Sequence, residues 1–357
     1  MSTAKVINVQ HPSASTTNNV NDASGNVTIG NNLTVTGTTS STGSFSAPSL
    51  TTSGNLSVAG TSTLTGNVTA GGTVAMASSF KRNRIINGNM LVWQRGTTGF
   101  ATNNAYCADR WLAKADTTFT SASQSTDAPS GFKYSLSVSG TGYAGALQRI
   151  EALNCTDLSG QTVTISFWAK QASGAGTNSL TVAIYYPNSA DNYAGGVTQI
   201  GANQYATGSS SWARYSFMFT GLPSGVLNGL NPYILSNVAG ASTILITGVQ
   251  IEVGTVATPY EMQIYSDQLA QCQRYYFNQG QQLYNSFYAL GSIGYTQLGR
   301  TYPVTMRATP TITLLNTAYS AWSFSTVIAS LNDFALSGTA SGGNGYIAYN
   351  FTASAEL

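Results

Sequence analysis

Charge is scarce in this sequence. Lys, Arg, Asp and Glu make up 7% of the 357 residues and the net charge at pH 7 is +2, whereas charged residues are about a quarter of an ordinary globular chain. So weak a field gives no reason to expect adsorption to nucleic acid or to an anionic membrane surface. Nucleic acid is therefore excluded from the expected partners.

Cysteine and histidine are also sparse, and neither is arranged as a metal site. Cys107, Cys155 and Cys272 lie far apart and in no CxxC pair, a pattern that predicts reduced, packed thiols rather than a zinc site or a disulfide framework. His11 is the only histidine, and it stands beside a proline without a catalytic or ligating partner. We expect no metal, no cofactor and no catalysis that depends on histidine.

Long apolar runs are missing as well. No run approaches the ~18 apolar residues that a membrane-spanning helix needs, and residues 1–15 lack the basic and then apolar layout of a signal peptide. We expect no membrane insertion, and we expect the chain to assemble in the cytoplasm of the cell that makes it.

The sequence does contain a repeat. Residues 23–80 hold no charge. A four-residue motif recurs in them, in which Asn is followed by an apolar residue, by Thr or Ser, and by a second apolar residue. The copies are spaced at near multiples of six residues, with one shift by a single residue. Each copy reads as a short strand that cannot bury its apolar edge alone. We therefore predict a shaft in which identical chains, three of them, intertwine. Its apolar positions include Val27, Ile29, Leu33, Val35, Leu56, Val58, Leu64 and Val68.

Strand-like segments follow at short intervals from residue 81 to about residue 260. Most alternate apolar with polar positions, as half-buried antiparallel strands do; Val163, Ile165, Phe167 and Ala169, for example, share one face. Seven or eight such segments predict an antiparallel sandwich, with the jelly roll as the favoured form. The tryptophans of these segments are expected in its core, namely Trp93, Trp111 and Trp168.

A short helix and a third unit are expected next. Leu269, Cys272 and Tyr276 fall on one helical stripe, and Ser266 or Asp267 can cap the helix start. The stripe fits either a three-fold bundle or packing on the chain's own sandwich, and we favour the sandwich. Residues 276–357 give further strands, rich in Tyr and Ser, which predict a small β-sandwich. The fold class is thus all-β with one connecting helix.

Several short motifs occur in a fixed order along the chain. They are NRIINGNM at 83–90, WQRG at 93–96, ADRW at 108–111, SFWAK at 166–170, QIEVG at 250–254, ATPYE at 257–261, QCQRYY at 271–276, RTYPVTMRATPT at 300–311 and ASAEL at 353–357. The ordered set resembles bacteriophage tail-fibre and virion structural proteins. In those proteins a jelly roll similar to carbohydrate-binding modules follows a repetitive shaft.

The resemblance implies an organisation and a role. It implies a virion-docking tail at 1–22, a trimeric β shaft at 23–80, a jelly roll at 81–262, a connector helix at 263–275 and a β tip domain at 276–357. The expected protein is a homotrimeric fibre on the tail or capsid surface of a virion, bound to other virion proteins through its N-terminus. It is expected to adsorb to host-surface polysaccharide by avidity, without catalysis. The alternatives are a capsid-decorating head fibre, a tail adaptor with no receptor role, and a glycan-depolymerising tailspike.

Glycan-binding candidates come from the loops of the central region. Sugar recognition needs exposed aromatic faces and amide or hydroxyl groups in a shallow site, and ordinary loop composition is the competing interpretation. An alternative for Asp191 is a ligand of a structural calcium ion. The candidates are Tyr186, Asn188, Asp191, Asn192, Tyr193, Asn203, Tyr205, Asn231 and Tyr233.

Catalytic motifs are weak. Glycoside cleavage needs paired carboxylates, and the nearest couples are Glu151 with Asp157 and Glu252 with Glu261. We favour ion pairs for these, with Glu252 beside Arg149 or Lys170, and a structural role for ADRW. The GxGxxG match at 140–145 resembles a dinucleotide loop, and the segment after it could form a turn or two of helix, but a second βαβ unit and the acidic residue that this fingerprint requires are missing. No catalytic residue is predicted.

Overall fold

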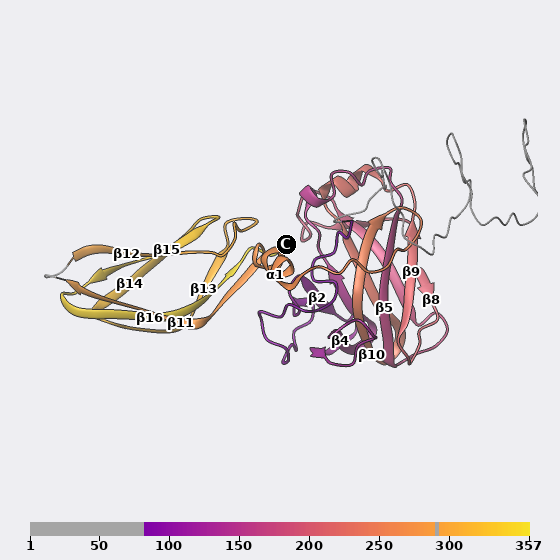
Figure 1. Ribbon diagram of the computed structural model, residues 1–357, viewed down its shortest axis with the longest axis horizontal. Helices are drawn as coiled ribbons and strands as arrows, with labels where there is room; N and C mark the ends of the chain where they lie inside the picture. The colour runs from indigo at the N-terminus through magenta and orange to yellow at the C-terminus, as the bar shows by residue number, and fades with distance from the viewer. Residues whose placement is uncertain (1–81, 290–292) are drawn as a thin grey trace, which may run out of the picture. The chain divides into compact units, whose positions relative to one another are not determined.

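The computed structural model describes residues 82–289 and 293–357 (Figure 1). These residues belong to one compact unit, Ala75–Leu357. The predicted docking tail and the predicted shaft, with its apolar positions, lie outside the described residues.

The central region is built almost entirely from antiparallel strands. Two short 3-10 helices, η1 (Ala152–Asn154) and η2 (Ser224–Asn228), interrupt them. The strands are β1 (Ala105–Tyr106), β2 (Trp111–Lys114), β3 (Thr118–Ser125), β4 (Ser135–Gln148), β5 (Val163–Ser173), β6 (Leu180–Pro187), β7 (Val197–Gln199), β8 (Gln204–Ala206), β9 (Ala213–Phe219) and β10 (Asn231–Val253). This arrangement confirms the predicted all-β fold.

Two long strands run through both layers of the sandwich. β4 pairs along almost its whole length with residues 233–246 of β10, with a register shift between Val238 and Ala241 of β10. On one side of this shift β10 pairs with β6, and on the other side it pairs with β5. β5 in turn pairs with β9, and β10, β5 and β9 lie side by side in Figure 1. The bulge lets one pair of strands bend from the first layer into the second, so that both layers close over one core. This is the antiparallel jelly-roll sandwich that was predicted.

The alternation seen in the sequence determines which side chains form the core. Val163, Ile165, Phe167 and Ala169 are all buried in it, as predicted. Among the tryptophans, Trp111 is fully buried and Trp93 packs partly buried against the same core.

The prediction for Trp168 was wrong. In an extended strand it points away from Phe167 and Ala169, and it lies half-buried on the outer face of β5, beside Phe132.

The GxGxxG match forms no dinucleotide loop, because residues 140–145 lie inside β4. Gly142 has a positive φ of 78° and pairs with Val238 where the register of β4 and β10 shifts. The predicted helical turns after it are limited to η1. The glycines therefore serve strand bending and close strand packing.

A helix and a second sandwich follow the jelly roll. The helix α1 (Tyr265–Gln273) buries Gln268 and Cys272. Neither Ser266 nor Asp267 caps it, because the helix begins at Tyr265, directly after Ile264, and both residues lie inside its first turn. Tyr276 belongs to β11 and not to the helix.

The strands of the second sandwich form two three-stranded antiparallel sheets, in the orders β11-β16-β13 and β12-β15-β14. Phe334, Tyr349 and Phe351 are buried at the centre of its core. The strands are β11 (Tyr276–Ala289), β12 (Ile293–Thr301), β13 (Thr311–Ser320), β14 (Trp322–Ala329), β15 (Asp333–Ala340) and β16 (Gly343–Ser354).

The end of the chain returns to the jelly roll. Arg110 is 1% exposed, forms an ion pair with Glu356, and lies with its guanidinium carbon 3.6 Å from the centre of the Tyr275 ring. The Tyr106 hydroxyl donates to the carbonyl of Leu357 at 2.9 Å. The ADRW motif is therefore a structural pin, as predicted, and its partner is the segment after β16, with Glu356.

The three cysteines are free and buried, as predicted. Burial raises the pKa of both Cys107 and Cys155 to about 12, so these thiols stay protonated and unreactive at neutral pH. In the part of the chain that the structure describes, no helix has both the length and the apolar character needed to cross a membrane.

Candidate functional site

One face of the first layer carries aromatic and polar side chains outward. Ala113 of β2, Val182 of β6 and Ile234 of β10 point into the core. Their neighbours along each strand must point to the other face. Tyr233 of β10 lies opposite Ala183 of β6, and Asn231 lies opposite Tyr185.

Two adjoining hollows lie on this face, with volumes of about 380 Å³ and 190 Å³. Both are lined by Lys114, Asp116 and Tyr233, so they form one continuous depression, which we call the tyrosine groove. Its remaining lining residues are Asn103, Asn104, Ala115, Arg149, Tyr193, Val197 and Asn231 in the larger hollow, and Tyr143, Thr181, Ala183, Tyr185, Asn203 and Leu235 in the smaller one.

Two tyrosine rings meet in the groove. The rings of Tyr185 and Tyr233 are 5.0 Å apart at their centres and nearly edge to face, at 63°. Lys114 lies with its Nζ 5.6 Å from the centre of the Tyr233 ring, and the same Nζ is 2.7 Å from Asp116. Burial raises the pKa of Tyr185 and of Tyr233. Both phenols therefore stay neutral near pH 7 and keep a hydroxyl that can donate or accept.

Amide groups extend the groove at the Tyr185 end. The Tyr185 hydroxyl donates to Gln199 Oε1 at 3.3 Å, and Gln199 Nε2 donates to Asn203 Oδ1 at 2.7 Å. This chain of hydrogen bonds fixes Tyr185 and Asn203 relative to each other. The groove thus combines fixed aromatic rings with amide and hydroxyl groups, which is the chemistry that a sugar ring requires.

The structure brings only some of the predicted binding residues together. Asn203, Asn231, Tyr193 and Tyr233 line the groove. Of these, Asn231 is 1% exposed and donates to the carbonyl of Gln148. Tyr193 is also buried, and its hydroxyl donates to the carbonyl of Ile150 at 2.5 Å. These two support the groove, whereas Tyr233 and Asn203 present groups to it.

Other predicted residues form turns beside the groove. Asn188 Oδ1 accepts from the hydroxyl of Thr198, and Asn192 Oδ1 accepts from the backbone N–H of Gly195. Tyr186 packs against the core.

Tyr205 is 46% exposed and receives a 3.5 Å contact from Asn203 Nδ2. It does not line the groove.

Asp191 also has a structural role here. It has a positive φ of 59°, and its Oδ1 accepts from the backbone N–H of Ala152 at 2.7 Å. Its other oxygen is 3.4 Å from Arg307. Among the described residues, no group of three His, Cys, Asp or Glu side chains is placed to hold a metal ion.

The sequence interpretation missed Tyr185, Tyr143, Lys114 and Asp116. The signal for Tyr185 was present, because Leu180, Val182 and Ile184 alternate as core positions of β6 and leave Tyr185 on the opposite face. Placing Tyr186 in a loop hid this alternation.

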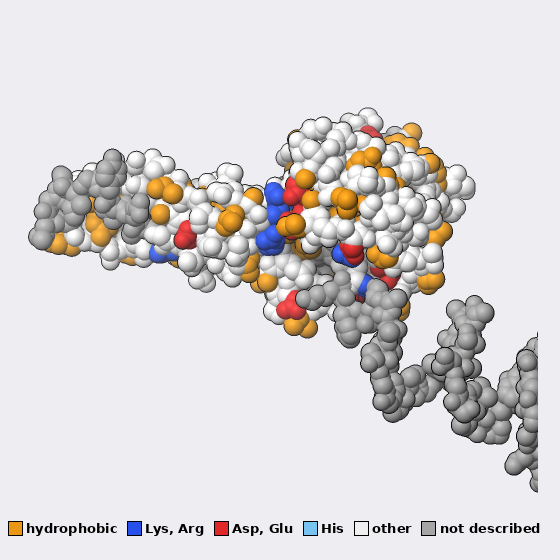
Figure 2. Space-filling view, turned by 90° about the horizontal axis from the view of Figure 1, so that it is seen from above, with side chains coloured by type: hydrophobic (Ala, Val, Ile, Leu, Met, Phe, Trp, Pro, Cys, Tyr) orange, Lys and Arg blue, Asp and Glu red, His pale blue; other side chains and the backbone are white. Residues whose placement is uncertain are grey.

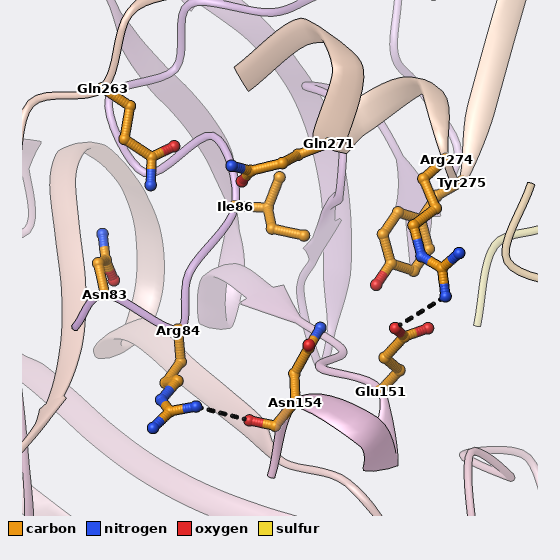
Figure 3. A pocket seen from close by; sticks show the side chains of 9 residues that line it. All are labelled: Asn83, Arg84, Ile86, Glu151, Asn154, Gln263, Gln271, Arg274 and Tyr275. Atoms are coloured by element: carbon orange, nitrogen blue, oxygen red, sulfur yellow. Dashed lines mark hydrogen bonds and ion pairs between the residues drawn. The ribbon is translucent and has the colours of Figure 1, made fainter. Parts of the chain in front are cut away.

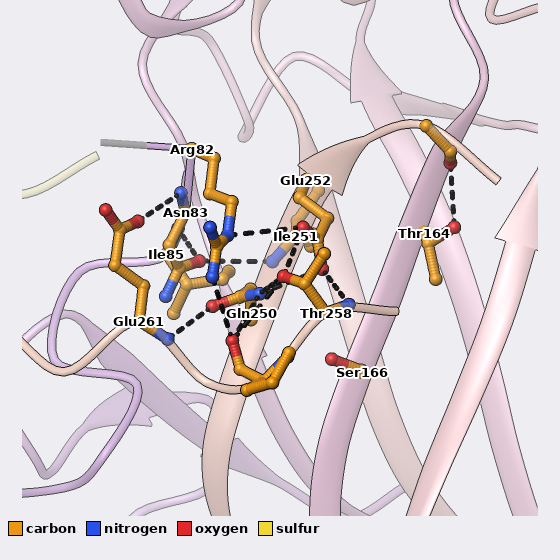
Figure 4. A network of polar contacts seen from close by, with 12 residues as sticks. Arg82, Asn83, Ile85, Thr164, Ser166, Gln250, Ile251, Glu252, Thr258 and Glu261 are labelled. Carbon is orange, nitrogen blue, oxygen red and sulfur yellow. Dashed lines mark hydrogen bonds and ion pairs between the residues drawn. The ribbon is translucent and has the colours of Figure 1, made fainter. Parts of the chain in front are cut away.

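The candidate catalytic carboxylates are held in structural contacts (Figure 4). Glu252 is 2% exposed and accepts from the hydroxyl of Thr258 at 2.7 Å, while Arg82 Nε lies 3.4 Å away. Glu261 Oε2 accepts from the backbone N–H of Asn83 at 3.0 Å. These contacts join residues 82 and 83, where the described chain begins, to the end of β10.

The cation predicted beside Glu252 was the wrong one. Arg149 lies elsewhere and donates to the carbonyl of Leu357, and Lys170 pairs with Asp127 at 2.7 Å. Arg82 is the cation beside Glu252 instead, because the first described residues pass next to Glu252 (Figure 4).

A second hollow, of about 280 Å³, lies between residues 83–86, η1 and α1 (Figure 3). Its cations are already engaged, because Arg84 pairs with Asp157 and Arg274 pairs with Glu151 at 3.2 Å. Tyr275, the one aromatic residue in its lining, is 1% exposed. Without an open ring face this hollow is a poorer sugar site than the tyrosine groove.

Comparison with known proteins agrees with the groove's chemistry. Residues 107–234 match a family model described as a carbohydrate binding domain. The matched range contains β2, β4 and β6 and extends to Tyr233 and Ile234 of β10. Over these residues the jelly roll is thus similar to a carbohydrate binding domain. A search of curated protein sequences finds no match.

Solved structures that resemble the chain have low identity. A putative sugar binding protein from Bacteroides thetaiotaomicron is 17% identical, over 48% of this chain and 100% of that one, with a TM-score of 0.35. A xylan-binding domain from Paenibacillus barcinonensis is 18% identical, over 45% and 95%, with a TM-score of 0.30. Tailspike protein 4 of Bacteriophage CBA120 is 18% identical, over 48% of this chain and 22% of that one, with a TM-score of 0.31.

Proposed function

We propose that this chain is a homotrimeric structural fibre of a bacteriophage virion, which binds glycans of the host surface through the tyrosine groove without cleaving them. One observation carries the binding function. The region that matches a carbohydrate binding domain contains Tyr185 and Tyr233, with their rings 5.0 Å apart in an open groove. Because a shallow site of this kind binds one sugar segment weakly, three copies on one fibre would gain affinity by avidity.

The state of the acidic residues supports binding without catalysis. Eight of the chain's twelve carboxylates form ion pairs with Lys or Arg. In the groove itself the acidic residue is Asp116, which is paired with Lys114. A glycosidase of the usual kind needs two carboxylates across the scissile bond. The competing function, a glycan-depolymerising tailspike, predicts release of reducing sugar from a host polysaccharide by the purified chain.

The surface around residues 82–86 supports association of copies. Four exposed apolar side chains lie in segments that contact these residues, and we call them the apolar rim. They are Leu153 (73% exposed), Val256 (71%), Met262 (56%) and Ile264 (67%). The contacts that join these segments to residues 82–84 include Arg84 to the carbonyl of Asn154 and Arg82 to the carbonyl of Pro259. Exposed apolar side chains in the segments next to residues 82–84, where the predicted shaft joins the jelly roll, fit a surface that other copies cover.

Binding through the groove is tested with the variant Tyr233→Ala in the full chain. The probe is a panel of soluble neutral polysaccharides that includes xylan, β-glucan and galactan, measured by affinity electrophoresis and calorimetry. We expect Kd for the bound polysaccharide to rise about fivefold, because one aromatic contact is worth on the order of 1 kcal/mol. Tyr319→Ala, which removes a 52% exposed tyrosine elsewhere, is the matched control and should leave Kd unchanged.

The proposal fails if Tyr233→Ala and the control bind alike. Attachment is tested separately, by locating the N-terminus in an assembled virion. A position on the capsid would favour the alternative of a head fibre, and a position on the tail without any glycan binding would favour a tail adaptor.

A further inference from the structure

A group of tyrosines lies on the outer face of the second sandwich, away from the jelly-roll groove. β11 and β16 pair there, with Ser286 opposite Tyr346 and Tyr288 opposite Asn344. The alternate residues, such as Phe287 and Ile347, point into the sandwich core. Tyr284, Ser286, Tyr288 and Tyr346 therefore share the outer face, where an antiparallel sheet normally carries polar side chains.

These tyrosines are unusually open. Tyr284 is 64% exposed and Tyr288 is 66% exposed. The rings of Tyr284 and Tyr346 lie nearly parallel, at 18°, with their centres 5.3 Å apart. The group borders a hollow of about 460 Å³, whose other lining includes Ser286 and Asn344.

The hollow carries no charge, and none of its lining residues is ionic. The sandwich has four charged side chains, and none of them lines the hollow. Each is engaged: Arg300 donates to Asn285, Arg307 contacts Asp191, Asp333 accepts from Ser330, and Glu356 pairs with Arg110. Figure 2 shows how sparse charged side chains are on the face of the molecule that it presents. A phosphate, a carboxylate or a basic peptide would find no partner here.

The hollow offers ring faces together with free hydrogen-bonding groups. Among the described residues, the side chains of Ser286 and Asn344 have no hydrogen-bond partner. Gly345 forms part of the floor, where an added Cβ would lie 2.4 Å from the Phe287 ring. Open rings beside unpaired hydroxyl and amide groups match the two kinds of surface that a neutral sugar presents, its C–H face and its hydroxyls.

We propose that the outer face of β11 and β16 is a second saccharide site, which binds a neutral oligosaccharide by stacking on Tyr284 and Tyr288. The two residues are four positions apart on one strand, or about 13 Å at about 3.3 Å per residue. One sugar ring cannot reach both, so the ligand is an oligosaccharide and not a monosaccharide. The site is independent of the tyrosine groove and deepens the proposed glycan binding.

The test uses soluble neutral oligosaccharides of two to six residues, derived from xylan, β-glucan and galactan, so that avidity does not enter. Binding to the full chain is measured by calorimetry and by saturation-transfer NMR. We expect Tyr284→Ala with Tyr288→Ala, in a chain that already carries Tyr233→Ala, to raise Kd at least tenfold. Tyr319→Ala in the same background is the matched control and should change nothing.

The outcomes separate the two sites. If Tyr233→Ala alone abolishes all binding, the second site is refuted while the proposed function stands. If binding is lost only in the Tyr284 and Tyr288 variants, the second site is supported and saccharide binding in the tyrosine groove is refuted. If these variants leave saccharide binding unchanged but alter the mass of the particle in solution, the face is a contact between copies and the saccharide proposal is overturned. Because both side chains are mostly exposed, the variants should fold, which an unchanged thermal transition verifies.

Discussion

At the scale of single residues, the charged side chains of this chain are few and are mostly used for structure. Arg110 shows this best, because it is almost fully buried between Tyr275 and Glu356. The Glu356 carboxylate also lies 3.1 Å from Arg95. One carboxylate near the end of the chain thus neutralises two arginines of the jelly roll.

We predict that Glu356→Gln is strongly destabilising. It leaves the buried Arg110 guanidinium without its anion, and breaking a buried ion pair costs about 3–5 kcal/mol of unfolding free energy. Asp127→Asn is the control, since that carboxylate is 45% exposed and pairs with Lys170 at the surface. It should cost less than about 1 kcal/mol. Urea unfolding measures both, and equal effects of the two variants would contradict a buried clamp.

Asp109 gives a pH dependence of unusual sign. Burial raises its pKa to about 6, although Arg95 at 3.7 Å acts in the opposite direction. The folded chain therefore takes up this proton at a higher pH than the unfolded chain does. Its contribution to stability is fully present below about pH 3.8, the ordinary value, and is lost as the pH rises through about 6.

We predict that Asp109→Asn removes this dependence. We compare the unfolding free energy of the variant with that of the native chain between pH 4 and pH 7. The difference should move in favour of the variant as the pH rises, by up to about 3 kcal/mol, because the pKa of Asp109 is shifted by about two units. Urea titrations at intervals of one pH unit measure the difference. A difference that is flat across this range would mean that Asp109 titrates normally.

At the scale of elements, alternation in the sequence marks which side chains of a strand face the core. The core faces of β5 and β6 follow directly from it. It could not reveal that β4 and β10 pass through both layers, because that depends on a bulge between distant strands. Residues 90–93 also look like a strand in the sequence but form none. There Met90 has a positive φ of 56° and Asn87 binds the backbone of Val92 in a tight loop.

The candidate site was only partly predictable, for a related reason. Aromatic and amide residues were sought in loops, whereas the groove is built on the outer face of strands. Tyr233 was identified and Tyr185 was not, although Tyr185 lies only two residue pairs away in the register of β6 and β10, on the same face. Some loop residues, such as Asn188 and Asn192, stabilise turns beside the groove. Their role depends on local hydrogen bonds that the sequence alone does not determine.

Gly145 tests the close packing of β4 on β10. A Cβ there would lie 2.2 Å from the carbonyl oxygen of Ile234. We predict that Gly145→Ala forces the two strands apart and lowers the unfolding free energy by about 1–3 kcal/mol. Gly176→Ala is the matched control, because open space surrounds that glycine, and it should be neutral or slightly stabilising. Thermal unfolding decides between them, and a neutral Gly145→Ala would show that the strands can adjust.

At the scale of the whole molecule, two sandwiches are linked by one short helix and by the returning end of the chain. Tyr106 and Arg149 of the jelly roll both donate to the last carbonyl, that of Leu357. Arg307 of the second sandwich contacts Asp191 of the jelly roll. Sequence motifs at 108–111 and 353–357 therefore belong to one structural feature, although about 240 residues separate them.

The proposed trimer gives the last prediction. Light scattering should find a particle of three chains of 37.2 kDa, or about 112 kDa. Leu56→Asp places a charge in the apolar repeat, and Ile264→Asp places one in the apolar rim. Each should shift the particle toward monomer, because burying an unpaired carboxylate between copies is costly. Ser40→Asp lies where the repeat loses its apolar positions and is the control that should leave the mass unchanged. A native chain that is monomeric at micromolar concentration would rule out the homotrimer, and glycan binding would then rest on single sites.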